Sequence, residues 1–274
     1  MSELETGTDH LLGRIEGRVA VLTLNRPERR NALSPEFYAG MERALPQIAA
    51  DNDIRVLMMT GTGGAFCAGG DVKRMNDENE AGTRNADGYE YAVTDLRRRQ
   101  RQVSLSLHEM PKPVVAAIDG AAAGAGFSIA MAADVRIASP KALLVTAFAN
   151  VGASGDFGGS WFLSRLLGEA RAKHLYFTSP RLDAAASLDI GLVSEILDSD
   201  DFDAAAVEWC AALAERAPLA MRYMKENINR ASNVDLATAL DAEAPNMVRT
   251  MSSADHREAA SAFVEKRSAT FHGS

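Results

Sequence analysis

The sequence is poor in the residues on which several classes of protein depend. Its 274 residues include two cysteines, Cys67 and Cys210, and aromatic residues make up 6% of the chain. Two cysteines cannot build a disulfide framework, which excludes a small disulfide-stapled scaffold. The first residues show no pattern typical of a signal peptide, so we expect a reducing, cytoplasmic location.

An excess of positive charge is also missing. Acidic residues outnumber basic ones by 37 to 29, and the formal net charge is −8. This balance argues against a general nucleic-acid-binding protein, and we expect no nucleic-acid partner. The most apolar stretch, residues 114–133, is almost long enough to cross a membrane, but Asp119 and several glycines interrupt it. We interpret it as a buried strand and helix and expect no membrane association.

The chain does contain a large apolar fraction, 47% of its residues. Short apolar runs alternate with amphipathic segments up to residue 197, and only helical patterns follow. This order predicts an α/β core over residues 11–197 and a helical C-terminal subdomain over residues 198–274. The polar residues 1–10 are expected to be flexible, and the polar segment 76–101 to be a mobile lid or an insertion. Its basic run, 97–101, is interpreted as a solvated helix face.

Glycines concentrate in two loops that follow apolar runs. Residues 61–71, GTGGAFCAGGD, hold five of them, and residues 113–134 read PVVAAIDGAAAGAGFSIAMAAD. Neither the GxGxxG spacing nor a Gly-Lys-Ser/Thr sequence occurs, so a nucleotide-binding loop is not indicated. The second loop leads into a helix, whose first amides lack partners and carry the positive end of the helix dipole. Such a turn can hold a developing negative charge.

A third glycine-rich stretch, residues 150–168, reads NVGASGDFGGSWFLSRLLG and contains one carboxylate, Asp156. It lies just before a predicted helix, which allows two interpretations. Asp156 could cap the helix, a role that asparagine or serine would serve equally. Alternatively, it could transfer protons in a reaction.

Five segments together resemble the crotonase superfamily, the enoyl-CoA hydratases and isomerases. The resemblance implies a crotonase-like spiral of ββα units with two stacked sheets and a C-terminal helical trimerisation region. It further implies homotrimers or homohexamers that bind an acyl-CoA thioester. Coenzyme A would then be part of the substrate, and we expect no further cofactor and no metal. The segments are AFCAGGDV (65–72), AAIDGAAAGAGFSIAMAADVRIAS (116–139), GDFGGSWFLSRLLG (155–168), DAAASLDIGLVSEIL (183–197) and FVEKRSATF (263–271).

The resemblance gives the glycine loops a function. In the family, two backbone amides bind the thioester oxygen, and the matching positions here are Gly70 and Ala125. Enolate chemistry beside a thioester builds charge on that oxygen, and fixed donors stabilise it. Ala125 replaces a common glycine, which preserves the amide donor if the backbone φ is negative there. Residues matched to coenzyme A contacts are Arg26, Ala32, Ala68, Asp71, Lys73 and Lys266.

The pattern departs from the family's hydratases at two positions. The glutamates that activate water in those enzymes correspond to Ser128 and Phe148, which we expect to lie beside the acyl group instead. Without a carboxylate at either position the usual hydration apparatus is absent. Asp156 matches the catalytic aspartate of several isomerases in the family. We therefore predict that Asp156 shifts a double bond by proton transfer, with burial raising its pKa from the ordinary value of about 3.9.

Three alternatives remain open. A hydratase could use another carboxylate, such as Glu90 of the 76–101 segment. A hydrolase or dehalogenase could use Asp156 as a nucleophile, although a family tryptophan is replaced by Phe148 and His108 is too close to the strand at 113–118 to match the expected histidine. Finally, the chain could be an acyl-CoA-binding member without catalytic activity.

Overall fold

The computed structural model describes residues 2–81 and 87–274 and contains two sheets. The larger sheet has the order β1-β2-β3-β4-β6-β8-β11. The first three strands pair in antiparallel fashion, whereas β3, β4, β6, β8 and β11 pair in parallel. The bounds are β1 Ser2–Glu3, β2 Leu11–Glu16, β3 Val19–Leu24, β4 Val56–Gly61, β6 Val114–Ile118, β8 Val135–Ala138 and β11 Glu195–Ile196.

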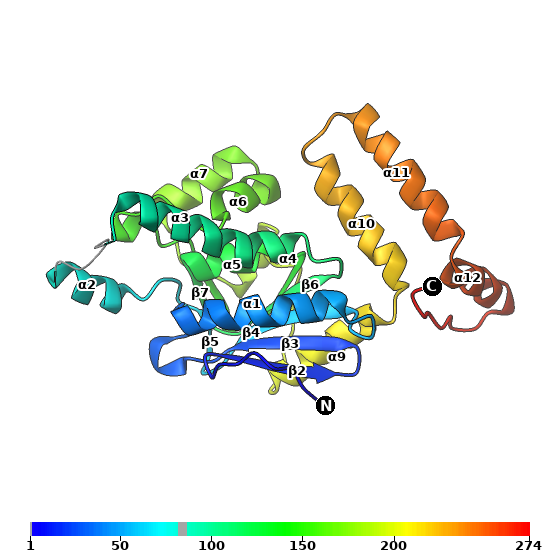
Figure 1. Cartoon of the computed structure of the whole chain (residues 1–274), viewed down its shortest axis with the longest axis horizontal. Coiled ribbons are helices and arrows are strands. Elements are labelled where there is room, and N and C mark those ends of the chain that lie inside the picture. Colours follow the sequence, from blue (N-terminus) through cyan, green and yellow to red (C-terminus); the bar gives the residue numbers. More distant parts are fainter. Residues whose placement is uncertain (1, 82–86) are drawn as a thin grey trace.

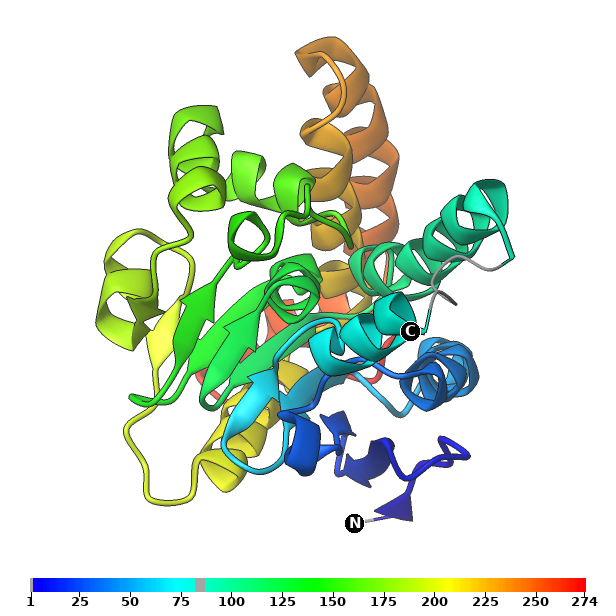
Figure 2. The same ribbon diagram turned by 90° about the vertical axis from the view of Figure 1, so that its left-hand side faces the viewer.

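The smaller sheet has the order β10-β9-β7-β5. Strands β5, β7 and β9 pair in parallel, and β10 adds an antiparallel edge. Figure 2 shows strands of both sheets at the centre of the molecule with helices around them. The bounds are β5 Ala65–Cys67, β7 Ala121–Ala123, β9 Leu143–Val145 and β10 Leu182–Asp183.

Helices occupy most of the remaining described chain. Short helices are η1 Pro27–Arg29, η2 Arg101–Leu105, α4 Ser106–His108 and η3 Ala149–Val151. The longer ones are α1 Pro35–Ala50, α2 Val72–Glu80, α3 Tyr89–Gln100, α5 Ala125–Ala132, α6 Gly159–Leu167, α7 Glu169–Thr178, α8 Ala184–Asp189, α9 Phe202–Ala214, α10 Pro218–Ala231, α11 Leu236–Met251 and α12 Ala254–Glu265. None of the helices in the described part of the chain is long and apolar enough to span a membrane.

A repeated ββα unit generates the two sheets. Strands β4 and β5 are followed by α2, strands β6 and β7 by α5, and strands β8 and β9 by α6. In each unit the first strand joins the larger sheet and the second joins the smaller one. The predicted crotonase-like spiral with a helical C-terminal region is thereby confirmed.

Period-two alternation in the central strands explains why both faces of the larger sheet are covered. In β3, Ala20, Leu22 and Leu24 face the main core beneath α1, whereas Val19 and Val21 face the opposite side. The same alternation recurs in β4 and β6. Because successive side chains of a strand point to opposite faces, an uninterrupted apolar strand needs a cover on each face.

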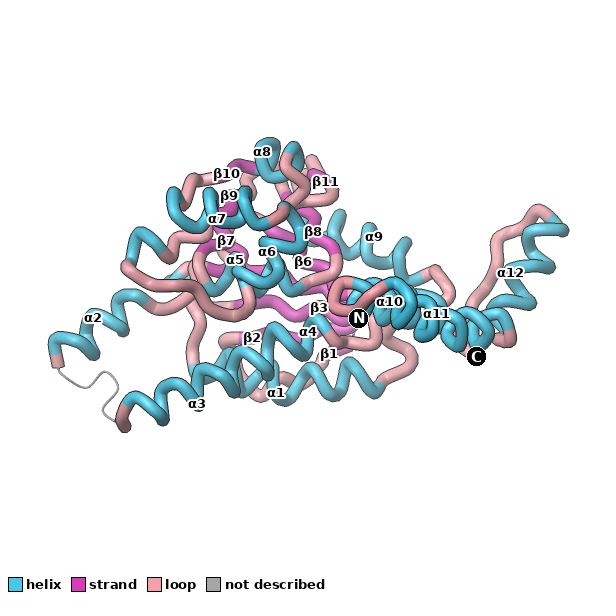
Figure 3. The backbone as a smooth tube through the Cα atoms, turned by 90° about the horizontal axis from the view of Figure 1, so that it is seen from above, coloured by secondary structure: helices cyan, strands magenta, loops and turns pink. Residues whose placement is uncertain are grey.

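Helix α9 supplies the cover on the second face. Its Phe202, Ala206, Cys210 and Ala214 pack against the alternate residues of β3, β4 and β6. This helix therefore belongs to the core, which moves the structural boundary expected at residue 197 to the turn between α9 and α10. The helices that follow it, α10, α11 and α12, extend away from the sheets (Figures 1 and 3).

The amino-terminal segment differs from the flexible tail that its polarity suggested. Residue 1 lies outside the described chain, but β1 pairs with β2, and Leu4 and Thr6 are buried. The Thr6 hydroxyl donates to the carbonyl of Leu11 at 2.5 Å. Burial of the Leu4 side chain and the hydrogen bond from Thr6 to Leu11 attach this segment to the sheet.

The segment expected to be a lid, residues 76–101, contains two helices. Helix α2 continues to Glu80 and α3 begins at Tyr89, while residues 82–86 lie outside the described chain. Figure 1 shows α2 and α3 at one end of the molecule, opposite the projecting α10–α12. This placement brings α3 over the region where α1 begins.

Candidate active site

The first two glycine-rich loops meet at the start of α5. The carbonyl of Gly69 accepts the amide of Leu33 at 2.8 Å, and Gly69 has a φ of +88°. A β-carbon on Gly69 would lie 2.6 Å from the oxygen of Ala123 and 3.0 Å from the nitrogen of Ala125. No other residue could approach α5 so closely in that backbone conformation. Because Gly69 has no side chain, the loop can lie directly against the amide of Ala125.

Two backbone amides are left without acceptors at this junction. Ala125 is the first residue of α5, so its amide has no partner within the helix. In the parallel bridge between Leu33 and Gly70, the hydrogen bond from the Leu33 amide goes to the carbonyl of Gly69. The amide of Gly70 takes no part in this bridge. Ala125 does not have a positive φ, so alanine fits this position without backbone strain. Both predicted oxyanion donors therefore lie on neighbouring loops with no acceptor among the described residues.

Asp156 lies in a tight turn just before α6. Gly155, Phe157 and Gly158 all have positive φ, and the Phe157 side chain is buried against Tyr38, with ring centroids 6.2 Å apart and an interplanar angle of 5°. Phe157 thus adopts a left-handed conformation that a bulky residue avoids unless packing enforces it. The structure holds Asp156 in place through the buried neighbour rather than through a cap, since α6 has no side-chain cap.

The environment of Asp156 suits a proton-transfer group. Its Oδ1 atom is covered and has no hydrogen-bond partner among the described residues. Burial raises the pKa of Asp156 from 3.8 to about 6. A carboxylate without compensating donors is destabilised relative to the neutral acid, so this side chain is a stronger base than an exposed aspartate.

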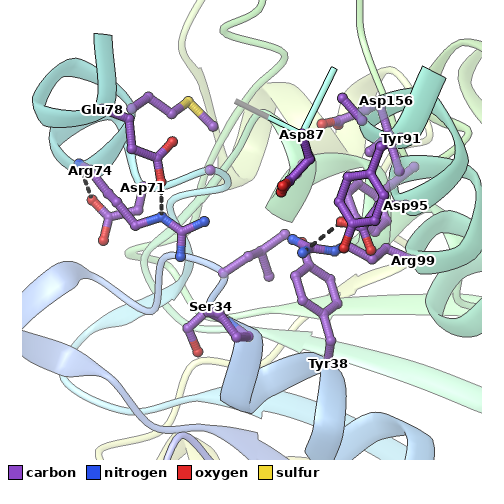
Figure 4. A pocket seen from close by; sticks show the side chains of 18 residues that line it. Ser34, Tyr38, Asp71, Arg74, Glu78, Asp87, Tyr91, Asp95, Arg99 and Asp156 are labelled. Atoms are coloured by element: carbon purple, nitrogen blue, oxygen red, sulfur yellow. Dashed lines mark hydrogen bonds and ion pairs between the residues drawn. The ribbon is translucent and has the colours of Figure 1, made fainter. Parts of the chain in front are cut away.

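Asp156, Gly70 and Ala125 line one pocket with a volume of about 430 Å³ (Figure 4). The pocket lies between α1, α2, α3 and the turn before α6, and its wall includes Leu33 and Leu96. The predicted base and the two predicted donors are therefore brought together, although the sequence separates them by as many as 86 residues, from 70 to 156. A thioester carbonyl and the carbons beside it can occupy the same cavity as the carboxyl group.

Ser128 and Phe148, which were predicted to lie beside the acyl group, do not line this pocket. Ser128 is fully buried in α5 and its hydroxyl donates to the carbonyl of Gly124 at 3.3 Å. Phe148 is 6% exposed and its ring stacks on Tyr176 at 5.7 Å. Tyr176 also approaches Gly155 and Gly159. The residues that replace the two glutamates thus form packed support for the Asp156 turn.

The predicted coenzyme A residues divide into two groups. Arg26 and Asp71 form an ion pair at 2.9 Å next to the oxyanion loop. Burial raises the pKa of Asp71, but the Arg74 amide and the Arg26 guanidinium outweigh it and leave that pKa below its usual value. Ala32 is buried, and the amide of Ala68 donates to the carbonyl of Arg30 at 2.9 Å. These four residues form the rim and support of the loop that carries Gly70.

The other two cationic candidates lie apart. Lys73 is exposed on α2 and precedes Arg74, which lines the pocket. Lys266 is exposed with a φ of +55° at the end of α12, which lies far from α2 and α3 in Figure 1. Within one chain, Lys266 therefore does not reach the pocket that contains Asp156.

Two further candidates also fall outside the pocket. Glu90, considered as an alternative acid, is exposed on α3 and does not contribute to the lining. His108 packs edge-on against Trp161 and Phe162, with ring centroids at 5.1 and 5.5 Å, in a separate groove beside α10. Neither side chain can act beside Asp156 in this structure.

Tyr38 and Arg99 are among the pocket residues that sequence reasoning missed. Tyr38 lies on the buried stripe of α1, where an aromatic residue is most simply interpreted as core. Arg99 belongs to the basic run that we interpreted as a solvated face, but its guanidinium carbon lies 4.7 Å from the centroid of the Tyr38 ring. No spacing in the sequence relates α1 to α3, so only their packing reveals this pair.

Comparisons with known proteins agree with this architecture. The model of the enoyl-CoA hydratase/isomerase family matches residues 14–274. The chain is 36% identical over 265 residues to a 1,2-epoxyphenylacetyl-CoA isomerase of Escherichia coli K12, covering 97% of this chain and 99% of the relative. It is 34% identical over 253 residues to a short-chain-enoyl-CoA hydratase of Clostridium acetobutylicum, covering 92% and 93%.

Solved structures show the same likeness. A crystal structure of an enoyl-CoA hydratase from Polaromonas sp. JS666 superposes with a TM-score of 0.87 at 36% identity, covering 95% of this chain and 99% of that chain. With the family model spanning nearly all of the chain and repeated ββα units building two sheets, the protein belongs to the enoyl-CoA hydratase/isomerase family of the crotonase superfamily.

Proposed function

We propose that this protein is an isomerase that shifts a double bond in an enoyl-CoA thioester. The observation that carries the proposal is the covered carboxyl group of Asp156, whose Oδ1 atom has no hydrogen-bond partner among the described residues, in the pocket that also contains Gly70 and Ala125. The positions of the two hydratase glutamates hold Ser128 and Phe148, which are packed away from this pocket. One acid–base group is sufficient for isomerisation, because the proton removed from one carbon is returned to another.

The chemistry follows from these groups. The carboxylate of Asp156 removes a proton from C2 of a 3-enoyl thioester, and the electron pair delocalises over the C3–C4 double bond and the thioester carbonyl. The oxygen of the resulting dienolate accepts hydrogen bonds from the amides of Gly70 and Ala125. Protonated Asp156 then delivers a proton to C4, which forms the C2–C3 double bond, and exchange of the carboxyl proton with solvent before this step introduces deuterium from deuterium oxide. Atoms and charge balance without water or a cofactor.

Other properties of the resemblance stand as proposals. Arg26, Ala32, Ala68 and Asp71 surround the Gly70 loop, which supports their assignment to coenzyme A binding. Lys73 adds a cation nearby, and Lys266 would need to come from another copy of the chain. We further propose that coenzyme A enters only as part of the substrate, and that the protein functions in the cytoplasm.

The decisive experiment follows proton exchange from solvent deuterium oxide. Asp156→Asn should abolish deuterium incorporation at C2 and C4 of a panel of straight, branched and cyclic enoyl-CoA thioesters, while the affinity for coenzyme A thioesters stays within a few fold. The amide keeps the shape of the side chain but cannot accept the proton as a base. Exchange that continues at the wild-type rate in this variant would exclude Asp156 as the base.

Hydration is the second candidate, since one relative at 34% identity is a short-chain-enoyl-CoA hydratase. It predicts that wild-type enzyme incorporates ¹⁸O from labelled water at C3 of the product, which the isomerisation does not. Thioester hydrolysis or aromatic dehalogenation through Asp156 as a nucleophile would instead place ¹⁸O in the Asp156 carboxyl group after one turnover. Tight binding without any exchange would indicate a non-catalytic acyl-CoA-binding protein.

A further inference from the structure

The pocket has a polar end formed by Tyr38 of α1 and Arg99 of α3. Both side chains line the same cavity as Asp156. The Tyr38 ring stacks on Phe157, the residue that follows Asp156, and the guanidinium carbon of Arg99 lies 4.7 Å from the centre of the Tyr38 ring. Figure 4 shows the Tyr38 ring rising from α1 toward Arg99. The pair is therefore coupled by packing to the turn that holds the base.

The Tyr38 hydroxyl is an available donor. Its hydrogen-bonding neighbour is Arg99, and a guanidinium can donate but not accept, so this contact leaves the hydroxyl proton free. Burial raises the pKa of Tyr38 to about 12, against the opposing effect of the Arg99 cation, so the hydroxyl stays protonated at neutral pH. A phenol in a partly apolar cavity gains most from a ligand oxygen that accepts this proton.

Arg99 is held in place but not saturated. Its Nη2 atom donates to Asp95 at 2.6 Å, and Asp95 also accepts from Arg98 at 2.8 Å. The Nε atom of Arg99 is covered and has no partner among the described residues. Because guanidinium groups carry five N–H donors, the ion pair with Asp95 leaves donors for a second acceptor.

The charges around the pair decide what kind of acceptor fits. Asp95 is shared between Arg99 and Arg98 and so offsets part of the charge of Arg99, and Asp156 and Asp87 add carboxyl groups to the lining of the same pocket. An anionic acyl group would therefore meet repulsion as well as attraction. A neutral oxygen, such as that of an ether, a hydroxyl or a ketone, can accept from both donors without that penalty.

We propose that Tyr38 and Arg99 form an acyl-group subsite that binds a neutral oxygen acceptor carried by the acyl chain or ring of the thioester. This inference rests on the proposed function for the location of the acyl group, and it adds the substrate class: oxygenated rather than purely hydrocarbon acyl groups. Tyr38 contacts the ligand directly, and Arg99 both orients the Tyr38 ring and supplies a second donor.

The test compares matched ligands that cannot isomerise. Cyclohexylacetyl-CoA and the three oxanylacetyl-CoA isomers, which have one ring oxygen at position 2, 3 or 4, differ by a single atom in nearly the same shape. Calorimetric titration of the wild-type protein should show at least one oxygen isomer binding about three- to tenfold more tightly than cyclohexylacetyl-CoA. Equal affinity for all four ligands would overturn the proposal.

Variants locate the effect. Tyr38→Phe should abolish the preference, so that the oxygen isomer and cyclohexylacetyl-CoA bind about equally. The affinity for cyclohexylacetyl-CoA should be unchanged, because only the hydroxyl is removed. Tyr89→Phe, the same change at an exposed position on α3, is the matched control and should keep the full preference. Arg99→Gln should lower the preference without removing it. A preference that survives Tyr38→Phe would refute the assignment.

Failure of this proposal is separable from failure of the proposed function. The four ligands are saturated, so their binding does not depend on turnover, and the proton-exchange experiment with Asp156→Asn does not depend on an oxygen in the acyl group. Loss of exchange in Asp156→Asn together with equal binding of the four ligands would retain the isomerase and discard the subsite.

Discussion

At the scale of single residues, Asp156 lies in an unfavourable environment that fits the role of base proposed for it. Its neighbours in the turn have positive φ and its Oδ1 atom lacks a partner among the described residues. Such features lower stability and are retained where a site uses them. The raised pKa of this carboxyl group is consistent with a base that works near neutral pH, and it leads to two measurable consequences.

The first concerns the pH dependence of the reaction. Because burial raises the pKa of Asp156 to about 6, the carboxylate form is lost as the pH falls through that value. We expect kcat/KM for isomerisation to be level above pH 7 and to fall about tenfold per pH unit below pH 5.5. A profile that stays level down to pH 4.5 would show that the base has an ordinary aspartate pKa.

The second concerns stability. A carboxyl group whose pKa is higher in the folded than in the unfolded state binds protons more tightly when folded, so stability falls as the pH rises from about 4 to about 6. Asp156→Asn cannot ionise and should escape this loss. We expect its free energy of unfolding at pH 8 to exceed that of the wild type by about 1–2 kcal/mol, since each pKa unit corresponds to 1.36 kcal/mol and the site is partly exposed.

Thermal unfolding at fixed protein concentration measures this difference. The gain should be clear at pH 8 and small at pH 4.5, where Asp156 is protonated in the folded protein. Asp200→Asn removes a carboxylate at an exposed position and should show no such pH-dependent gain. A lower melting temperature for Asp156→Asn at pH 8 would contradict the destabilising role of the charge.

At the scale of elements, the start of α5 is the feature on which the oxyanion site depends. The helix begins at Ala125 because Gly124, with a φ of +54°, turns the chain from β7 into it. Gly126 allows α5 to lie against β5, since a β-carbon there would be 2.2 Å from the carbonyl oxygen of Cys67. The small residues of this stretch thus allow the backbone of α5 to lie close to that of β5, which places the amide of Ala125 beside the Gly70 loop.

Proline at position 125 tests this amide directly. Proline is favoured at the first position of a helix, where it removes an N–H that has no partner in the helix. Ala125→Pro should therefore leave the circular dichroism spectrum intact and lower kcat/KM by about 10²–10³, which corresponds to about 2.7–4 kcal/mol for one oxyanion donor. Ala125→Gly keeps the amide and should remain within a few fold of wild type. Near-normal activity in the proline variant would exclude the donor.

At the scale of the whole molecule, the projecting helices carry apolar residues that the single chain leaves uncovered. Leu236, Leu240, Met247 and Met251 are all exposed and recur on one side of α11. Helix α10 is attached to the core by the ion pair of Lys225 with Asp134 at 2.7 Å, so this face is held in a definite direction. Exposed apolar stripes of this kind are typical of subunit interfaces.

We therefore expect self-association through α11, as the family resemblance implies for a trimer or hexamer. Leu240→Lys combined with Met247→Lys should convert the assembly to monomers in sedimentation experiments, because two charges would be buried in an apolar contact. Phe177→Lys combined with Leu188→Lys changes exposed apolar residues on α7 and α8 and should leave the assembly unchanged. A wild-type protein that sediments as a monomer would contradict the expectation.

The sequence by itself determined the local structure and the inventory of chemistry. Apolar periodicity indicated the strands and most helices. Serine followed by proline at 34–35 is a local sequence typical of a helix start, and the structure shows the Ser34 hydroxyl accepting the amide of Phe37 there. Dense glycine predicted loops that approach other backbone, and Asp156 was found because it is the one carboxylate in its loop. These features depend on residues that are adjacent in the chain, so they can be predicted from the sequence.

Only the tertiary structure decided which side chains share the pocket. It brought Tyr38 and Arg99 into the pocket that contains Asp156, buried Ser128 and Phe148, and placed α9 on the sheet rather than with the projecting helices. A buried aromatic residue and a charged helix face have the same sequence pattern whether or not they meet. Their meeting depends on how α1 and α3 pack, with 60 residues of chain between Tyr38 and Arg99, and hydrophobic burial, which drives that packing, is not directional.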